Sequence, residues 1–133
     1  MHSHETTKRR EPYVFSDDVQ QVVRNVIQLR YKHLPVWYTL FHEHIAYKTP
    51  VIRPLFFQYT YDTNVFAIYN QLLVGTDIMV RAVSEPGVSS VPVYFPGGSN
   101  EYWVSLDGST VYQGSGNYVD IPVTINTVRG GTT

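Results

Sequence analysis

Two histidine pairs are the first residues whose types could do chemistry. His42 and His44 flank Glu43, and His2 and His4 lie near the first residue. A zinc-binding helix places histidines four residues apart, whereas residues two apart on a helix point to nearly opposite sides. The sequence therefore predicts that His42 and His44 are ordinary helix residues, and it predicts no metal ligand. His2 and His4 would share a face if extended, which leaves chelation open, but without a third ligand a solvated pair is expected.

Three other motifs point to chemistry, and each has a simpler explanation. Lys8-Arg9-Arg10 is short for a nucleic-acid patch, so a solvated or internally paired surface is expected. Gly114-Ser115-Gly116 lacks the Lys-Ser/Thr of a phosphate-binding loop and predicts a turn. Residue types leave a Ser-His-Asp triad open, but no Gly-x-Ser-x-Gly elbow is present. Four strand aromatics favour core or cross-strand pairs over a sugar-binding platform: Tyr102, Trp103, Tyr112 and Tyr118.

Length and composition limit what these residues can belong to. The chain has 133 residues, with 10 Lys+Arg against 11 Asp+Glu, which suits one domain or the tail of a larger one. The near-zero charge gives no electrostatic case for nucleic acid or for a membrane. There is no Cys, no signal-peptide pattern and no apolar run near the ~20 residues of a membrane span. A complete (β/α)8 barrel, which needs roughly 200 residues or more, is excluded.

Residues 17–47 are predicted to form a kinked helix or a pair of helices. Ser16 is a good N-cap, and apolar residues then recur at three- and four-residue spacing. Pro35 should break the helix near His33, because proline lacks the backbone donor. The second segment is apolar around more of its circumference, so we expect it to lie deeper in the protein.

The remaining residues are predicted to be rich in strands. Residues 51–59 are nearly continuously apolar, which is typical of a strand of a parallel sheet buried on both faces, although Pro54 is awkward there. Short strands and turns then alternate, as in an antiparallel sandwich. The expected strands are 72–74, 78–83, 91–95, 102–105, 111–113 and 118–125. Residues 129–133 are polar and should be frayed.

Several blocks, in the same order along the chain, resemble glycoside hydrolase family 31. They include Thr7-Lys8-Arg9-Arg10-Glu11-Pro12-Tyr13, the Arg53-Pro54-Leu55 motif and Arg129-Gly130-Gly131, and they cover residues 2–4, 7–13, 30–41, 50–56, 70–75, 91–97 and 129–131. The resemblance implies an α+β chain. Residues 1–68 would be the C-terminal part of the catalytic (β/α)8 barrel, contributing a helix and the last strand. Residues 69–133 would be an incomplete antiparallel β-sandwich C-terminal domain.

The resemblance also implies a function. The parent would be a retaining alpha-glucosidase that releases terminal alpha-linked glucose and uses no metal or cofactor. His2 matches a histidine that contacts the sugar, whereas both catalytic carboxylates of the family lie upstream of the matched region, so no catalytic residue is assigned. We therefore expect a C-terminal fragment or truncated product that is inactive alone. The alternatives are a non-catalytic carbohydrate-binding or scaffold module and a non-functional product.

One block of the sequence points to a particular branch of the family, and two positions differ from the family pattern. The Lys8–Pro12 block is most similar to the branch that removes glucose from N-glycans in the endoplasmic reticulum lumen with a lectin-like beta subunit. Tyr69-Asn70 stands where the family tends to have paired acids. Val128 joins Arg129 directly, where the family usually has another strand, so the closing strand of the sandwich is in doubt. Exposed strand edges and aggregation are expected.

Overall fold

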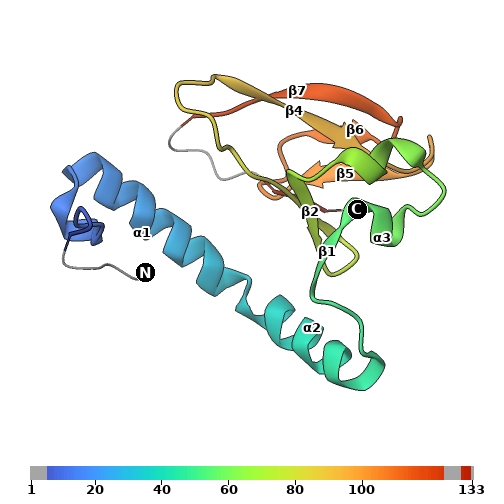
Figure 1. Ribbon diagram of the computed structural model, residues 1–133, viewed down its shortest axis with the longest axis horizontal. Coiled ribbons are helices and arrows are strands. Elements are labelled where there is room, and N and C mark those ends of the chain that lie inside the picture. Colours follow the sequence, from blue (N-terminus) through green and yellow to red (C-terminus); the bar gives the residue numbers. More distant parts are fainter. Residues whose placement is uncertain (1–5, 125–129, 133) are drawn as a thin grey trace. The chain divides into compact units, whose positions relative to one another are not determined.

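The computed structural model describes residues 6–124 and the backbone of 130–132 (Figure 1). The contacts divide the chain into two compact units, residues 1–39 and residues 40–133. The first unit contains a short 3-10 helix η1 (Pro12–Val14), α1 (Asp17–Lys32) and the start of α2 (Leu34–Tyr47). The second contains the end of α2 and all the strands.

The helix pair predicted for residues 17–47 is confirmed, with the break at His33. Ser16 occupies the N-cap position in an extended conformation, although its side chain makes no capping bond. α1 ends where the His33 N–H bonds to the carbonyls of Leu29 and Arg30 at 3.2 and 3.1 Å. Pro35 follows as the second residue of α2, where the helix needs no backbone donor.

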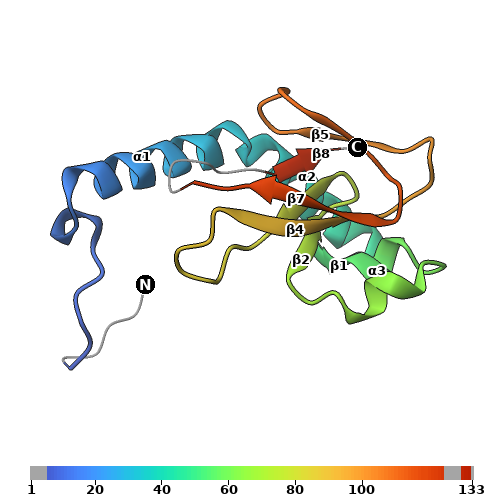
Figure 2. The same cartoon turned by 90° about the horizontal axis from the view of Figure 1, so that it is seen from above.

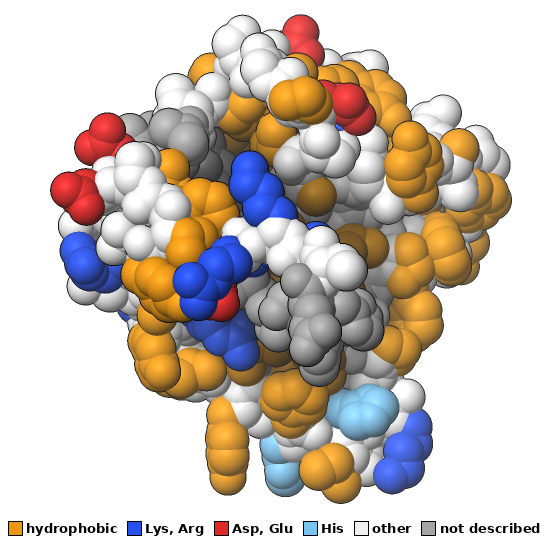
Figure 3. Space-filling model, turned by 60° about the vertical axis from the view of Figure 1, so that its left-hand side comes forward, with side chains coloured by type: hydrophobic (Ala, Val, Ile, Leu, Met, Phe, Trp, Pro, Cys, Tyr) orange, Lys and Arg blue, Asp and Glu red, His pale blue; other side chains and the backbone are white. Residues whose placement is uncertain are grey.

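The prediction that the second helix lies deeper is wrong. Neither α1 nor α2 contains a buried residue, and α2 carries large exposed side chains, among them Tyr38 at 81% and Ile45 at 69%. Hydrophobic side chains stand out beside the histidines at the bottom of Figure 3, where α2 lies. The apolar pattern of α2 is therefore real, but most of the side chains that form it are exposed.

The strand predicted for residues 51–59 is shorter than expected and pairs differently. β1 spans only Ile52–Pro54 and runs antiparallel to β2, and α3 (Leu55–Gln58) follows at once. Pro54 is the N-cap of α3, at φ −67° and ψ 157°, so the awkward proline marks the end of the strand. Burial alternates instead of being continuous: Arg53 and Leu55 are buried, while Ile52 is exposed.

Two antiparallel sheets make up the rest of the fold (Figures 1 and 2). The six-stranded sheet has the order β1-β2-β3-β8-β5-β6, and β4 pairs with β7 alone. The other elements are η2 (Thr63–Ala67), β2 (Gln71–Val74), β3 (Ile78–Arg81), β4 (Ser90–Phe95), β5 (Tyr102–Ser105), β6 (Val111–Gln113), β7 (Asn117–Pro122) and β8 (Gly130–Thr132). Strands β2 to β7 lie close to their predicted ranges, although residue 125, the last predicted for β7, is outside the described residues.

The last strand corrects a second prediction. Residues 130–132 are not frayed but form β8, which pairs with β3 on one side and β5 on the other. Without β8, the facing edges of β3 and β5 would leave rows of unpaired backbone groups, which is costly. The Gly-Gly-Thr segment therefore links β3 to β5 within the sheet. The doubt about a further strand before Arg129 falls on residues 125–129, which lie outside the described residues.

The core lies in the second unit and draws on both sheets and the segment before them. Its buried residues are Leu55, Val65, Ile68, Leu73, Met79, Val91, Val93, Tyr94, Phe95, Trp103 and Ile121. Leu40 of α2 contacts the β2–β3 turn, where a Cβ on Gly75 would lie 2.6 Å from the Leu40 Cδ2. Gly75 has φ +68°, a backbone conformation that favours glycine.

Candidate functional site

The residue predicted to contact the sugar lies outside the described part of the chain, and the histidines of α2 have ordinary structural surroundings. His2 and His4 lie outside the described residues. His44 Nδ1 is 2.8 Å from the carbonyl oxygen of Thr49 and so links α2 to the segment that follows it. Among residues 6–124, no three His, Asp or Glu side chains are grouped as a metal site would require.

The basic cluster and the glycine motif have the local roles predicted for them. Arg9 Nε lies 3.8 Å from the Glu11 carboxylate, and Arg9 Nη2 donates to the Tyr13 hydroxyl at 3.1 Å. Arg9 is thus internally paired, and all three basic residues are exposed on the surface. Gly116 has φ +67°, and the Ser115 N–H bonds to the Gln113 carbonyl at 2.8 Å, which confirms a turn.

Three of the four strand aromatics pack in the core or in a cross-strand pair. Trp103 is fully buried, its Nε1 donates to the Pro96 carbonyl at 3.2 Å, and its ring lies 6.4 Å from that of Phe95. Tyr112 stacks on Phe95 at 4.7 Å with 12° between the rings. Core packing is therefore confirmed for Trp103 and Tyr112, and a cross-strand pair is confirmed for Tyr118, which lies opposite Tyr94 in the β4–β7 pair. Tyr102 is half exposed on β5.

A buried polar network, not predicted from sequence, joins the two sheets. The Gln71 amide of β2 accepts from the Tyr94 N–H at 2.8 Å and donates to the Tyr94 carbonyl at 2.9 Å. The Tyr94 hydroxyl donates to Asp62 Oδ2 at 2.5 Å and accepts from the Asn64 amide at 3.3 Å. Burial, helped by the bond to Asp62, raises the pKa of Tyr94. Gln71 therefore acts as a strand partner for β4, and Tyr94 is held at both ends.

A second tyrosine engages the other carboxylate near the core. The Tyr59 hydroxyl donates to Glu101 Oε1, and burial followed by that hydrogen bond raises the pKa of Tyr59. Asp62 and Glu101 are thus each bonded to a tyrosine hydroxyl. These hydrogen bonds give both carboxylates a structural role.

Arg53 of β1 is a buried cation without a carboxylate among the described residues. It is 6% exposed, its Nε donates to the Pro50 carbonyl at 2.6 Å, and its guanidinium lies 5.5 Å from the Phe57 ring centre. Within the described part of the chain, no acidic side chain forms an ion pair with it. One backbone acceptor and one ring face compensate only part of the free-energy cost of burying a charge.

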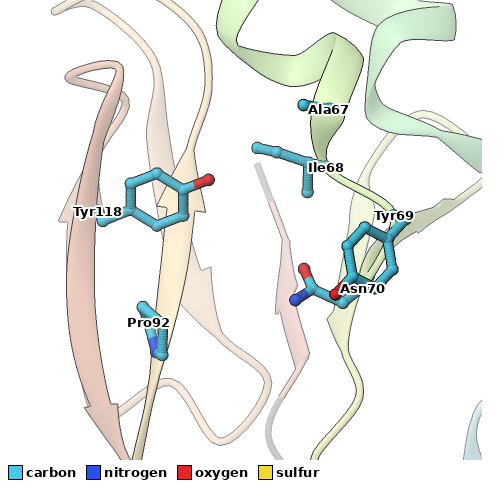
Figure 4. A pocket seen from close by; sticks show the side chains of 6 residues that line it. All are labelled: Ala67, Ile68, Tyr69, Asn70, Pro92 and Tyr118. Atoms are coloured by element: carbon cyan, nitrogen blue, oxygen red, sulfur yellow. The ribbon is translucent and has the colours of Figure 1, made fainter.

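An open hollow lies on the outer side of the polar network. It measures about 390 Å³ and is lined by Ala67, Ile68, Tyr69, Asn70, Pro92 and Tyr118. Figure 4 shows Tyr118 and Pro92 on one side, Ile68, Tyr69 and Asn70 on the other, and the Asn70 amide turned toward the first side. Tyr118 lies edge-on against the buried Tyr94, with ring centres 5.1 Å apart. Of the four aromatics considered in sequence, only Tyr118 reaches this hollow.

Two family models match the chain consecutively. The C-terminal domain of glycosyl hydrolase family 31 matches residues 48–132, and the TIM-barrel domain of the same family matches residues 1–40. The chain belongs to glycosyl hydrolase family 31. The predicted family is thereby confirmed, as is the fold class of a barrel end followed by the C-terminal β-domain. The boundary predicted between residues 68 and 69 stays a prediction.

Curated relatives in family 31 match nearly the whole chain. Neutral alpha-glucosidase C of Mus musculus is 37% identical over 136 residues, which is 98% of this chain and 15% of the relative. Neutral alpha-glucosidase AB of Mus musculus is 36% identical over 135 residues, with 98% and 14% covered. The chain thus spans about 15% of the length of these relatives.

A solved family 31 structure has the same fold. A dextranase of Flavobacterium johnsoniae, solved in complex with glucose, superposes with a TM-score of 0.84 at 28% identity. The superposition covers 92% of this chain and 15% of the dextranase. In the described part of our chain, no helix is long and apolar enough to cross a membrane.

Proposed function

We propose that the chain forms the end of the catalytic barrel and the proximal C-terminal domain of a retaining alpha-glucosidase, which releases terminal alpha-linked glucose. Two consecutive family matches, to barrel and C-terminal domain in that order, carry the proposal. The 36–37% identity to neutral alpha-glucosidases supports an alpha-glucoside as the substrate. We place residues 1–68 in the barrel and 69–133 in the sandwich, as the sequence predicts.

The 133-residue chain is proposed to be inactive by itself. Retaining hydrolysis needs a nucleophile and an acid/base whose carboxyl groups are about 5–5.5 Å apart. Asp62 and Glu101 are each engaged by a tyrosine hydroxyl, which supports structural roles for both. The resemblance puts the two catalytic carboxylates upstream of the matched residues, so their chemistry must come from outside this chain.

The contribution of this chain to the substrate site is proposed to be His2. The resemblance assigns it to sugar contact, and a neutral imidazole can donate one hydrogen bond and accept another, which suits a hydroxyl group. Its role would be to orient the sugar and not to transfer a proton to the glycosidic oxygen.

A narrower assignment is to the glucosidase II alpha subunit. The Lys8–Pro12 block and the similarity to neutral alpha-glucosidase AB support it. The substrate would then be the glucose of N-glycans, the location the endoplasmic reticulum lumen, and the partner the glucosidase II beta subunit. Capture of the purified chain by an immobilised beta subunit tests this assignment. No capture, while a full-length neutral alpha-glucosidase is retained, would contradict it.

Hydrolysis is tested with the purified 133-residue chain and an aryl alpha-glucoside. We expect no release of the phenol above a buffer blank, while a full-length neutral alpha-glucosidase turns the compound over. Activity that co-purifies with the chain through two unrelated columns would overturn the proposal.

A second candidate is a non-catalytic carbohydrate-binding or scaffold module. The open hollow beside Tyr69 and Tyr118 favours it, because it offers two tyrosine rings and an amide to a ligand without any acid.

A further inference from the structure

We propose that the hollow lined by Tyr69, Asn70, Pro92 and Tyr118 binds one neutral pyranose unit of an alpha-glucoside and does not cleave it. The site lies wholly within the second unit, between the η2–β2 connection and the β4–β7 pair. It rests on the proposed function only for the choice of glucose as the sugar.

The size and shape of the hollow suit a single ring. Its volume of about 390 Å³ is at the lower end of the roughly 300–1,000 Å³ typical of small-molecule sites. Two sides face each other, with Tyr118 and Pro92 opposite Tyr69 and Asn70 (Figure 4). A flat ligand can therefore enter from solvent and contact both sides.

The side chains that line the hollow match the two kinds of surface on a pyranose. Tyr69 and Tyr118 are 89% and 58% exposed, so their rings are open to the apolar C–H face of a sugar. The Asn70 amide offers one acceptor and two donors, which can serve two neighbouring hydroxyl groups. None of the described residues forms a hydrogen bond with that amide, so it is available to a ligand.

The charge of the hollow selects a neutral ligand. None of the six lining residues is charged. The Arg81 guanidinium lies beside Pro92, but it already donates to the Pro92 carbonyl at 3.3 Å and to the Ala82 carbonyl. The nearest carboxylate of the polar network, Asp62, already accepts from the Tyr94 hydroxyl at 2.5 Å. A phosphorylated sugar would bring a charge with no counter-ion in the lining, whereas hydroxyl groups need only the amide and the tyrosine hydroxyls.

The buried network holds one side of the hollow in place. Tyr118 packs edge-on against Tyr94, whose backbone is held by Gln71 and whose hydroxyl is held by Asp62. The Asn70 carbonyl accepts from the Ala82 N–H at 3.3 Å, which fixes the start of β2. Binding residues held in this way lose little conformational freedom when a ligand arrives.

The test is a titration of the 133-residue chain with maltose, isomaltose and glucose 6-phosphate, followed by ¹H–¹⁵N spectra. We expect saturable shifts of the Asn70 side-chain amide and of β7 amides with the two disaccharides, at millimolar affinity, and weaker binding of the phosphate. Tyr118→Ala and Asn70→Ala should weaken binding at least about tenfold, and Tyr118→Phe should weaken it less because the ring remains.

Matched controls are Tyr102→Ala and Asn100→Ala. Tyr102 is 52% exposed on β5, and neither residue lines the hollow. Both variants should bind as the unmodified chain does, and the spectra of every variant report whether it is folded. No saturable shift, or equal weakening by test and control variants, would overturn the inference. Hydrolysis of an aryl alpha-glucoside, measured in parallel, reports separately on the proposed function.

Discussion

The sheet region (β1 to β8 with α3 and η2) and the helix region (α1 and α2) differ in how far their apolar residues are buried. All eleven residues of the buried core belong to segments between Leu55 and Ile121, and they interlock two sheets with α3 and η2. α1 and α2 contain as regular an apolar pattern, yet none of their residues is buried. Apolar side chains are thus buried together in the sheets, whereas in the helices they are exposed or, like Leu40, only partly buried.

The contrast follows from where each region belongs in the family. Residues 1–40 match the barrel domain, whose helices cover an inner ring of parallel strands, whereas residues 48–132 match the C-terminal domain of the family. A β-domain can close its own core, but a barrel helix cannot. The exposed apolar side chains of α2 therefore mark a surface for packing and not a badly formed helix.

The largest loss of stability is expected from a substitution at the centre of the sheet region. Trp103→Ala removes a fully buried ring that packs on Phe95 and Tyr59, and it should lower the free energy of unfolding by about 4 kcal/mol. Urea denaturation followed by near-ultraviolet circular dichroism measures this. Tyr102→Ala, next to it and half exposed, is the control and should cost less than about 1 kcal/mol.

The amide that joins the sheets should have the next largest effect. Gln71→Leu leaves the Tyr94 N–H and carbonyl buried without partners, which should cost about 3 kcal/mol. Gln113→Leu is the matched control, because the exposed Gln113 side chain lies on the edge strand β6 and, among the described residues, bonds only to the Ser99 carbonyl. Equal midpoints in urea for the two variants would show that the sheets do not depend on this junction.

Raising the pH should weaken the sheet region through its buried tyrosines. The pKa values of Tyr59 and Tyr94 are raised in the folded chain, so above the ordinary value of about 10 the unfolded chain loses these protons first. Stability should therefore be complete below about pH 10 and fall as the pH rises further. Tyr94→Phe should cost about 1 kcal/mol at pH 8 and reduce the decline between pH 9.5 and 11.

The exposed Tyr102→Phe is the control for that titration. It should leave the dependence of unfolding on pH unchanged. If Tyr94→Phe also left it unchanged, the buried hydroxyl would not be the group that responds.

The smallest effect is expected in the helix region. Tyr38 is 81% exposed, so Tyr38→Ser should change the free energy of unfolding of the sheet region by less than about 0.5 kcal/mol. The same change should reduce self-association of the chain, measured by sedimentation velocity, because it removes apolar surface. A loss of stability above 1 kcal/mol would mean that α2 is part of the folded core.

Local patterns predicted most of the elements because local chemistry decides them. The acidic cap at residues 16–18, the break before Pro35 and the strand and turn alternation after residue 70 all depend on near neighbours. The strand β1 is shorter than predicted because Pro54 is the N-cap of α3. The continuous apolar run of residues 51–59 gave no sign of this helix. β8 could not be predicted, because Gly130–Thr132 has no strand pattern and pairs only through backbone groups.

The site residues needed the three-dimensional structure for a different reason. Gln71 and Tyr94 are 23 positions apart, and Asp62 is 32 positions from Tyr94, so no motif links them. The hollow combines residues 67–70 with one residue from each of β4 and β7. Its sole signal in the sequence was that Tyr69-Asn70 replaces the paired acids of the family, a departure whose position says nothing of Tyr118.

Hydrogen exchange of the 133-residue chain tests the central claim most directly. The claim is that the two sheets form a stable core of their own, whereas the helices do not. We predict that amides of β2, β4 and β7 are protected at least about a hundredfold more than those of α1, and that Trp103→Ala abolishes the protection of the sheets alone. Equal protection of α1 and the sheets, lost together in Trp103→Ala, would contradict the account.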